Sequence, residues 1–161
     1  MSSTIPPDPL TLVYHSIVSA IVADEFVKSL HENKVIFLDF LPLPDMPHAT
    51  TPPIPSRDMP RMSLMQDTAL WGSNNSCTGR LDYVINMRIQ GFGTRSVEIN
   101  PLVFHLLQMI RPGHLDGNLR SIMYRERPLK TISRGGTATY DHDDERQFWT
   151  CTIPIEIQIY L

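Results

Sequence analysis

The fold class of this chain of 161 residues is decided by its C-terminal stretch, Gln147-Phe-Trp-Thr-Cys-Thr-Ile-Pro-Ile-Glu-Ile-Gln-Ile-Tyr-Leu161. Apolar side chains occupy every second position: Trp149, Cys151, Ile153, Ile155, Ile157 and Ile159. Mostly polar residues occupy the positions between them: Thr150, Thr152, Pro154, Glu156, Gln158 and Tyr160. Because successive side chains of a strand point to opposite faces, the alternation predicts a long strand over 148–160 with one buried face. β-Branched isoleucine suits such a pleated surface better than it suits a helix.

Other stretches carry strand signals of differing clarity. Residues 80–90 alternate apolar and polar side chains, which predicts a second half-buried strand. We also expect strands over 62–71 and 119–127, and a short strand over 35–41. Pro154 has no backbone donor, so the closing strand should lie at an edge or contain a bulge at that point.

Two stretches predict helices. Asp8-Pro9 forms a helix start, with aspartate as the N-cap and proline in the first turn. Apolar residues then recur at steps of three and four positions, which predicts one amphipathic helix over 9–31. Asn100-Pro101 is expected to cap a second helix over 100–110. This second helix is apolar nearly all round, so we expect it to be heavily buried.

The order of the elements predicts a single α+β domain over residues 1–161. Strands joined by polar turns favour a mainly antiparallel, twisted sheet of about four to five strands packed against the two helices. Residues 42–60 hold seven prolines, which exclude a helix or a central strand there. We expect a long Pro-rich loop, either solvated or acting as an arm that becomes ordered on a partner.

Charge and cysteine content narrow the environment of the protein. The formal net charge is −3, which gives no general attraction to nucleic acid or to an anionic membrane. Eleven arginines against three lysines favour protein interfaces, where arginine is enriched. Cys151 falls on the apolar side of the closing strand and Cys77 in a polar turn, so we expect free thiols in a reducing compartment. The chain starts without a signal-peptide pattern, and its apolar runs fall short of the ~20 residues that span a bilayer, so we expect a soluble protein without a membrane partner.

No sequence motif points to catalysis, to a cofactor or to a metal. The densest group of potential ligands, Asp141-His-Asp-Asp-Glu145, lacks the spacing and the glycine of a calcium loop and has no second histidine at metal-binding spacing. We interpret it as an acidic hairpin tip that contacts a neighbouring subunit. His15 and His105 have no partner at a recognisable catalytic spacing, so we expect them to be structural. A small α+β enzyme that uses these histidines, His142 and the acidic group is the less favoured alternative.

Basic and aromatic residues also gather between positions 120 and 127. The expected strand over 119–127 would place Arg120 and Tyr124 on one face. Arg125 and Arg127 would lie on the opposite face, interrupted by an acidic residue. The divided patch and the acidic net charge argue against sequence-specific binding of nucleic acid.

In the order of its elements the chain resembles the tail terminator proteins of long-tailed bacteriophages, the lambda-like siphophage class and among them the T-five-like phages. The resemblance rests on the N-terminal helix, the strand and irregular arm after it, the strand at 80–90, the apolar helix at 100–110 and the closing strand at 148–160. It covers most of the chain and involves no invariant motif. The Pro-rich segment 42–60 departs from the more compact members of the family.

This resemblance implies a structural virion protein and not an enzyme. It implies a homo-oligomeric ring, a hexamer in the family, that caps the tail tube, stops its polymerisation and forms the head-to-tail joining interface. The partners would be further copies of the chain, the tail tube protein and a head-completion or neck protein, with DNA passing through the lumen without sequence recognition. The protein would reside at the head-proximal end of the tail in the virion, and in the host cytoplasm during assembly. Another head- or tail-completion protein of a phage connector is the alternative within this class.

Charged and polar residues are the candidates for contacts with a subunit or another partner. They are Arg57, Asp58, Arg61, Asp141, His142, Asp143, Asp144, Glu145, Glu156 and Gln158. The polar positions of the closing strand are expected to face the lumen or the next subunit. We expect no catalytic, cofactor-binding or metal-binding residue.

Overall fold

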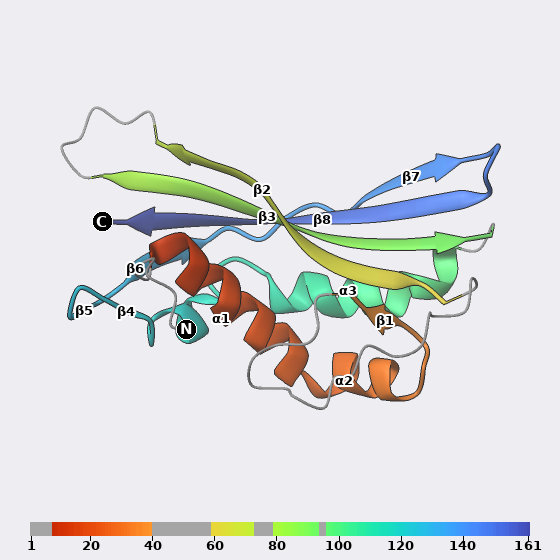
Figure 1. The fold of residues 1–161 in the computed structure, drawn as a ribbon, viewed down its shortest axis with the longest axis horizontal. Helices are drawn as coiled ribbons and strands as arrows, with labels where there is room; N and C mark the ends of the chain where they lie inside the picture. Colours follow the sequence, from red (N-terminus) through yellow and green to blue (C-terminus); the bar gives the residue numbers. More distant parts are fainter. Residues whose placement is uncertain (1–7, 40–58, 73–78, 94–95) are drawn as a thin grey trace, which may run out of the picture.

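The computed structural model describes residues 8–39, 59–72, 79–93 and 96–161. A twisted, mostly antiparallel sheet forms one layer, and the helices pack beneath one face of it (Figure 1). The helical layer consists of α1 (Pro9–Ala23), α2 (Glu25–Glu32), the 3-10 helix η1 (Ser96–Ile99), α3 (Asn100–Met109) and the short α4 (Asp116–Leu119). The fold is therefore α+β, as the sequence predicts.

The sheet is built around β8 (Phe148–Tyr160), the closing strand of the chain. The strand order is β1-β2-β3-β8-β6, and β7 also pairs with β8. The other strands of this sheet are β1 (Phe37–Leu38), β2 (Arg61–Trp71), β3 (Arg80–Phe92), β6 (Lys130–Ser133) and β7 (Thr139–Asp143). These pairs are antiparallel, except that β1 runs parallel to β2. The strands predicted over 62–71, 80–90 and 148–160 are confirmed.

β8 and β3 form the centre of the sheet. They pair along their whole length, from Arg80 opposite Tyr160 to Phe92 opposite Phe148. The apolar positions of β8 are buried against the helices, each at 4% exposure or less. The helix α1 contributes to the same core with Val13, Ile17, Val18 and Ile21. The alternation along the closing strand therefore identifies its buried face correctly.

Pro154 lies in β8 at a place where one side of the strand has no neighbouring strand among the described residues. The Arg134 N–H donates to the Glu156 carbonyl, so the even-numbered residues of β8 direct their backbone groups away from β3. On that side β7 pairs with 148–152 and β6 with 157–160, which leaves Pro154 between them. Its missing N–H therefore costs no ladder hydrogen bond, and the predicted local edge is confirmed.

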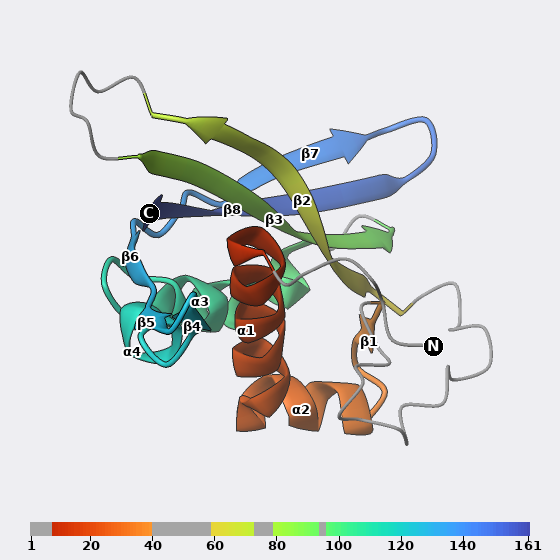
Figure 2. The same cartoon turned by 60° about the vertical axis from the view of Figure 1, so that its left-hand side comes forward.

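The prediction of one helix over 9–31 is wrong, because the chain bends by 69° between α1 and α2. Figure 2 shows α2 turning away from the axis of α1. Asp24 joins them with extended backbone (φ −67°, ψ 126°), and its carboxylate accepts a hydrogen bond from the Val27 N–H. This cap replaces a backbone acceptor that the first turn of α2 lacks. Among the described residues no single helix is long and apolar enough to cross a membrane; only α1 and α2 together, across their bend, meet that test of length and composition.

α3 differs from the prediction at its start and on its outer side. Ile99 occupies the N-cap position without a side-chain hydrogen bond, and Asn100 lies within the first turn. The predicted Asn100 cap is therefore wrong; the Asn100 side-chain oxygen accepts a hydrogen bond from the Tyr140 hydroxyl at 3.1 Å. Phe104 is 63% exposed, so the helix is not buried all round. Its buried face consists of Leu102, Val103 and Leu106.

The predicted strand over 119–127 is also wrong. α4 ends at Leu119, and β4 (Met123–Tyr124) then pairs with β5 (Arg127–Pro128) in a separate small hairpin. Arg125 and Glu126 form the turn with φ values of 50° and 64°, which suit the twist of a two-residue hairpin. The Arg125 guanidinium lies 5.2 Å from the centre of the Tyr124 ring, so this basic and this aromatic side chain stack on each other. The predicted separation of these two residues onto opposite faces is therefore not found.

Some sequence predictions fall outside the described residues. The Pro-rich loop over 42–60 is described only at Met59 and Pro60, and the strand over 35–41 only up to Asp39, where β1 has two residues. Cys77 is also outside this part of the chain. Cys151 is free and buried, and burial raises the pKa of its thiol, so the neutral group packs as a small apolar side chain.

Candidate functional site: two sheet edges and an apolar cavity

β2 forms one edge of the sheet, and most of its outer side has no partner among the described residues. β1 pairs only with Arg61 and Met62, at the start of β2. Every residue from Met65 to Trp71 is exposed. The large apolar side chains of this stretch, Met65, Leu70 and Trp71, have exposed fractions of 48, 53 and 63%. The edge is therefore open and partly apolar.

The hydrogen bonds of β2 show which of its backbone groups point outward. The Gly72 N–H donates to the Arg80 carbonyl, so the chain bonds to β3 at Gly72 and at every second residue before it, back to Thr68. Bonded and non-bonded residues alternate along an antiparallel pair. Ala69 and Trp71 therefore direct their N–H and C=O groups away from β3, toward the open edge.

Nearer its start, the outer side of β2 is already occupied. The Met62 carbonyl accepts a hydrogen bond from the Asp39 N–H, beside β1. The same alternation turns Leu64 outward, and its carbonyl accepts a hydrogen bond from the Tyr14 hydroxyl of α1 at 2.9 Å. A bulge then interrupts the register at Asp67. From the bulge to the end of β2, no described residue pairs with the outer side of the strand.

β7 forms the edge on the opposite side of the sheet. The even-numbered residues of β8 face β7, so the first, third and fifth residues of β7 bond to β8. Tyr140 and His142 therefore direct their backbone groups outward, where no strand pairs with them in the part of the chain that the structure describes. All of β7 is exposed. Each edge thus presents two outward residues separated by one residue: Ala69 and Trp71 on β2, and Tyr140 and His142 on β7.

Of the predicted acidic hairpin tip at 141–145, residues 141–143 belong to β7, and residues 144–145 lie in the turn that joins β7 to β8; all five are exposed. The Asp143 carboxylate closes the turn by accepting hydrogen bonds from the N–H groups of Glu145 and Arg146 at 3.1 and 3.2 Å. His142 Nδ1 lies 3.4 Å from the Asp144 carboxylate. Within the described ranges, no three His, Cys, Asp or Glu side chains gather as a metal site would require. The tip is an exposed acidic surface beside an open edge.

The remaining predicted interface residues are scattered. Arg61 is exposed at the start of β2, with its guanidinium 5.6 Å from the centre of the Phe37 ring. Glu156 is exposed on the outer face of β8. Gln158 is only 8% exposed, because β3 and β6 flank it, so little of this side chain is accessible to a partner in the single chain. Arg57 and Asp58 lie outside the described residues.

An apolar cavity of about 630 Å³ opens beneath the sheet, between α2, η1 and the ends of β3 and β8. Its lining includes Phe26, Leu30, Val35, Phe92 and Trp149. Among the described residues that line the cavity, Glu98 has the ionisable side chain. The histidines and the acidic turn that an enzyme would use do not meet here.

A second depression of about 320 Å³ lies on the outer face of the sheet and is polar. Arg80 Nε lies 3.1 Å from the Asp82 carboxylate within it, and Arg134 and Glu156 complete its charged lining. Positive and negative side chains are balanced there. The depression therefore favours neither an anion nor a cation.

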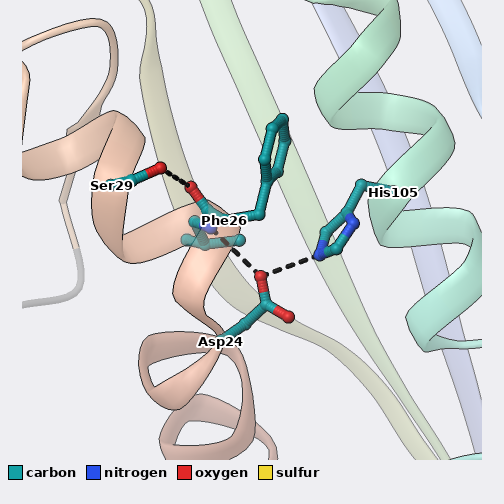
Figure 3. A network of polar contacts seen from close by, with 5 residues as sticks. Asp24, Phe26, Ser29 and His105 are labelled. Atoms are coloured by element: carbon teal, nitrogen blue, oxygen red, sulfur yellow. Dashed lines mark hydrogen bonds and ion pairs between the residues drawn. The ribbon is translucent and has the colours of Figure 1, made fainter.

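Beside the apolar cavity, Asp24 connects α2 to α3 (Figure 3). Its Oδ2 accepts the Val27 N–H at 3.0 Å and lies 2.7 Å from His105 Nε2. The His105 ring packs against Phe26, with 4.7 Å between the ring centres. One carboxylate thus caps a helix and holds a histidine of another helix. His105 is a hydrogen-bonded structural residue, as predicted, but its partner lies 81 positions away in the sequence.

Sequence reasoning missed both the open part of β2 and the apolar cavity. Residues 62–71 show no clean alternation, because the bulge at Asp67 reverses the faces of the residues that follow it. That break in the pattern was the one local signal of an irregular edge strand. The cavity joins residues from distant parts of the chain and leaves no local signal.

Comparison with models of known protein families finds no match, and a search of curated proteins finds no similar sequence. Among solved structures, the fold is similar to that of a chain from the virion of a native gene transfer agent particle, with a TM-score of 0.58. The alignment covers 92% of this chain and 95% of that chain at 8% sequence identity. At such low identity the likeness shows a shared fold over nearly the whole of both chains.

Proposed function

We propose that this protein is a structural virion component that forms a ring at the head-proximal end of a phage-like tail, as a tail terminator. The observation that carries the proposal is the fold shared with a chain of a gene transfer agent virion. The order of elements in the sequence, which resembles tail terminators, supports the finer assignment.

The two open edges of the sheet support a ring. β2 offers Ala69 and Trp71, and β7 offers Tyr140 and His142, from opposite sides of one sheet. Because the two edges differ, a contact between them is heterologous. Such a contact repeats from copy to copy and closes into a ring when the rotation permits. Six subunits is the number that the resemblance to tail terminators implies.

In this role the protein acts through assembly and not through catalysis. The ring would cap the tail tube, stop its polymerisation and present its other face to a head-completion or neck protein. DNA would pass through the lumen without sequence recognition, which suits a chain of net charge −3. An enzyme is less well supported, because neither of the two cavities described above is lined by His15, His105, His142 or the acidic residues 141–145.

Purified protein tests the proposal in two steps. Light scattering gives the particle mass and negative-stain images show the shape, first for the protein alone and then with purified tail tubes. We expect a ring in solution, or a monomer that becomes a ring on a tube end, and we expect capped tubes to stop growing. A protein that stays monomeric and never caps a tube contradicts the proposal.

A different head- or tail-completion protein is the second candidate, since the similar structure is named only as part of a virion. A tail terminator should co-purify with tails from assembling particles. A head-completion protein should co-purify with filled heads instead. The distribution between these two fractions decides between the candidates.

A further inference from the structure

We infer that β2 of one copy pairs antiparallel with β7 of a second copy, through Ala69 and Trp71 on one edge and Tyr140 and His142 on the other. This inference rests on the ring proposed above and deepens it, because it names the two surfaces by which neighbouring copies join.

Beyond its bulge, β2 has among the described residues none of the features that keep sheet edges apart. An edge strand invites pairing because its N–H and C=O groups have no partner, and proteins counter this with lysine, proline or bulges. From Met62 to Trp71 the sequence has neither lysine nor proline, and the bulge at Asp67 precedes the free part. Beyond the bulge, Leu70 and Trp71 are both more than half exposed.

The two edges match in the spacing of their outward groups. In an antiparallel pair, hydrogen-bonded positions recur at every second residue, and each bonded pair exchanges two hydrogen bonds. Ala69 opposite His142 therefore puts Trp71 opposite Tyr140. In this one register, the backbone N–H and C=O groups of both outward residues on each edge find hydrogen-bond partners.

The same register keeps the faces of the sheet continuous. Trp71 pairs with Leu81, and Tyr140 pairs with the buried Cys151, so both aromatic side chains lie on the helix side of the sheet. Trp71 is 63% exposed and Tyr140 is 49% exposed in the single chain. The new pair would cover both, and aromatic pairs across neighbouring strands stabilise sheets.

Charge favours the antiparallel orientation over the parallel one. After His142, the acidic turn at 143–145 would run along β2 toward Met65. There the Arg88 Nη1 lies 3.9 Å from the Met65 sulfur, and Arg88 Nε has no hydrogen-bond partner among the described residues. A carboxylate brought beside this arginine gains a charge-assisted contact. Parallel pairing would carry the same turn past Trp71, away from Arg88.

Asp67 opposes this favourable contact with Arg88, because its own negative charge lies on the path of the acidic turn. Like charges on neighbouring strands are destabilising. The strength of the contact must therefore come mainly from the backbone hydrogen bonds and from the burial of Trp71. A test should accordingly act on the backbone.

Two proline substitutions test the contact from its two sides. Ala69→Pro removes an outward N–H of β2 and His142→Pro removes one of β7, while the bonds to β3 and β8 remain. We expect each variant alone to stay folded and monomeric under conditions in which the unaltered protein forms rings. Ala69→Val and His142→Val retain the N–H, and as matched controls they should still form rings.

A mixture of the two proline variants gives the sharpest result. The Ala69→Pro copy keeps its β7 edge and the His142→Pro copy keeps its β2 edge, so one contact remains possible between them. At high protein concentration we expect the mixture to reach twice the monomer mass by light scattering and to go no further. Rings formed by either proline variant alone, or a mixture that remains monomeric, overturn the inference.

Hydrogen exchange on the unaltered protein provides a check that does not depend on folding of the variants. The amides of Ala69, Trp71, Tyr140 and His142 should exchange at least about tenfold more slowly in the ring than in the monomer. Protection already present in the monomer would show that the chain covers its own edge. Protection that appears when tail tube protein binds copies that have not formed a ring would assign the edge to the tube. Both results overturn the inference.

The outcomes also separate this inference from the proposed function. Rings whose four edge amides remain unprotected contradict the β2–β7 contact and leave the ring itself standing. A protein that never forms a ring, alone or on tube ends, contradicts both.

Discussion

β8 and β2 are long strands of the same sheet in opposite surroundings. β8 has partners on both sides along most of its length, and its apolar positions are 0–4% exposed. β2 has β3 on one side, and every residue from Met65 onward is exposed. Figures 1 and 2 show β8 between β3 and β7, and β2 on the far side of β3. The centre of the sheet therefore holds the fold, and the edge strand lies uncovered by the described residues.

The largest expected effect comes from placing a charge in β8. Ile157 is 1% exposed, burial of an isoleucine contributes about 1.5–3 kcal/mol, and an unpaired buried charge adds a large further cost. Ile157→Asp should therefore abolish the fold, as measured by circular dichroism and thermal unfolding. The exposed neighbour provides the control, since Glu156→Ala should change the free energy of unfolding by less than about 0.5 kcal/mol. A soluble Ile157→Asp protein of native size would show that β8 is not the core.

The second effect concerns Tyr83 in β3, which lies between the two compared strands. Its hydroxyl donates to Gln66 Oε1 of β2 at 2.7 Å, and burial raises the pKa of Tyr83 above its ordinary value. Folding thus favours the protonated phenol. The stability that this preference adds is fully present below about pH 10 and is lost as the pH rises further.

We expect the free energy of unfolding to fall above about pH 10, by at most about 1.4 kcal/mol per pH unit for this one proton. Urea titrations at several alkaline pH values measure the slope. Tyr83→Phe should make that slope shallower. The same slope in both proteins would mean that Tyr83 is not the group responsible.

A smaller effect is expected at the hydrogen bond that ties β2 to the helices. Tyr14→Phe removes the donor to the Leu64 carbonyl and should lower the free energy of unfolding by about 0.5–1.5 kcal/mol. Tyr124→Phe is the matched control, because the Tyr124 hydroxyl makes no hydrogen bond with the described residues. Equilibrium denaturation compares the two. Equal losses would mean that the Tyr14 bond does not secure the edge strand.

The smallest effect on the single chain is expected at the open end of β2. Trp71→Ser should change the free energy of unfolding of the monomer by no more than about 0.5 kcal/mol, because the side chain is 63% exposed. Trp149, at 4% exposure beside β3, provides the contrast, and Trp149→Ser should cost about 3–5 kcal/mol. Denaturation of both variants measures the difference. Similar losses at the two tryptophans would remove the distinction between centre and edge.

The sequence predicted best where one repeating pattern continues without interruption. The isoleucine alternation of β8 and the alternation of 80–90 identified both central strands and their buried face. The acidic group at 141–145 was recognised as exposed, because a run of charges has no apolar face to bury. Predictions failed where a single residue or a distant neighbour decides the local structure. Asp24 breaks a continuous apolar pattern by capping a new helix. Arg125 and Glu126 adopt positive φ values, which their residue types do not predict.

The sequence by itself determined the α+β class, the two central strands and which of their faces is buried, because side-chain periodicity is a local property of the chain. Only the tertiary structure decided which edges are open. The outward direction of Ala69 and Trp71 depends on a bulge and on bonds to β3, and the burial of Gln158 depends on the strands that flank it. The pairing of Asp24 with His105 also joins positions far apart in the chain. Such contacts depend on which distant segments become neighbours in the fold, and a local sequence pattern does not predict those neighbours.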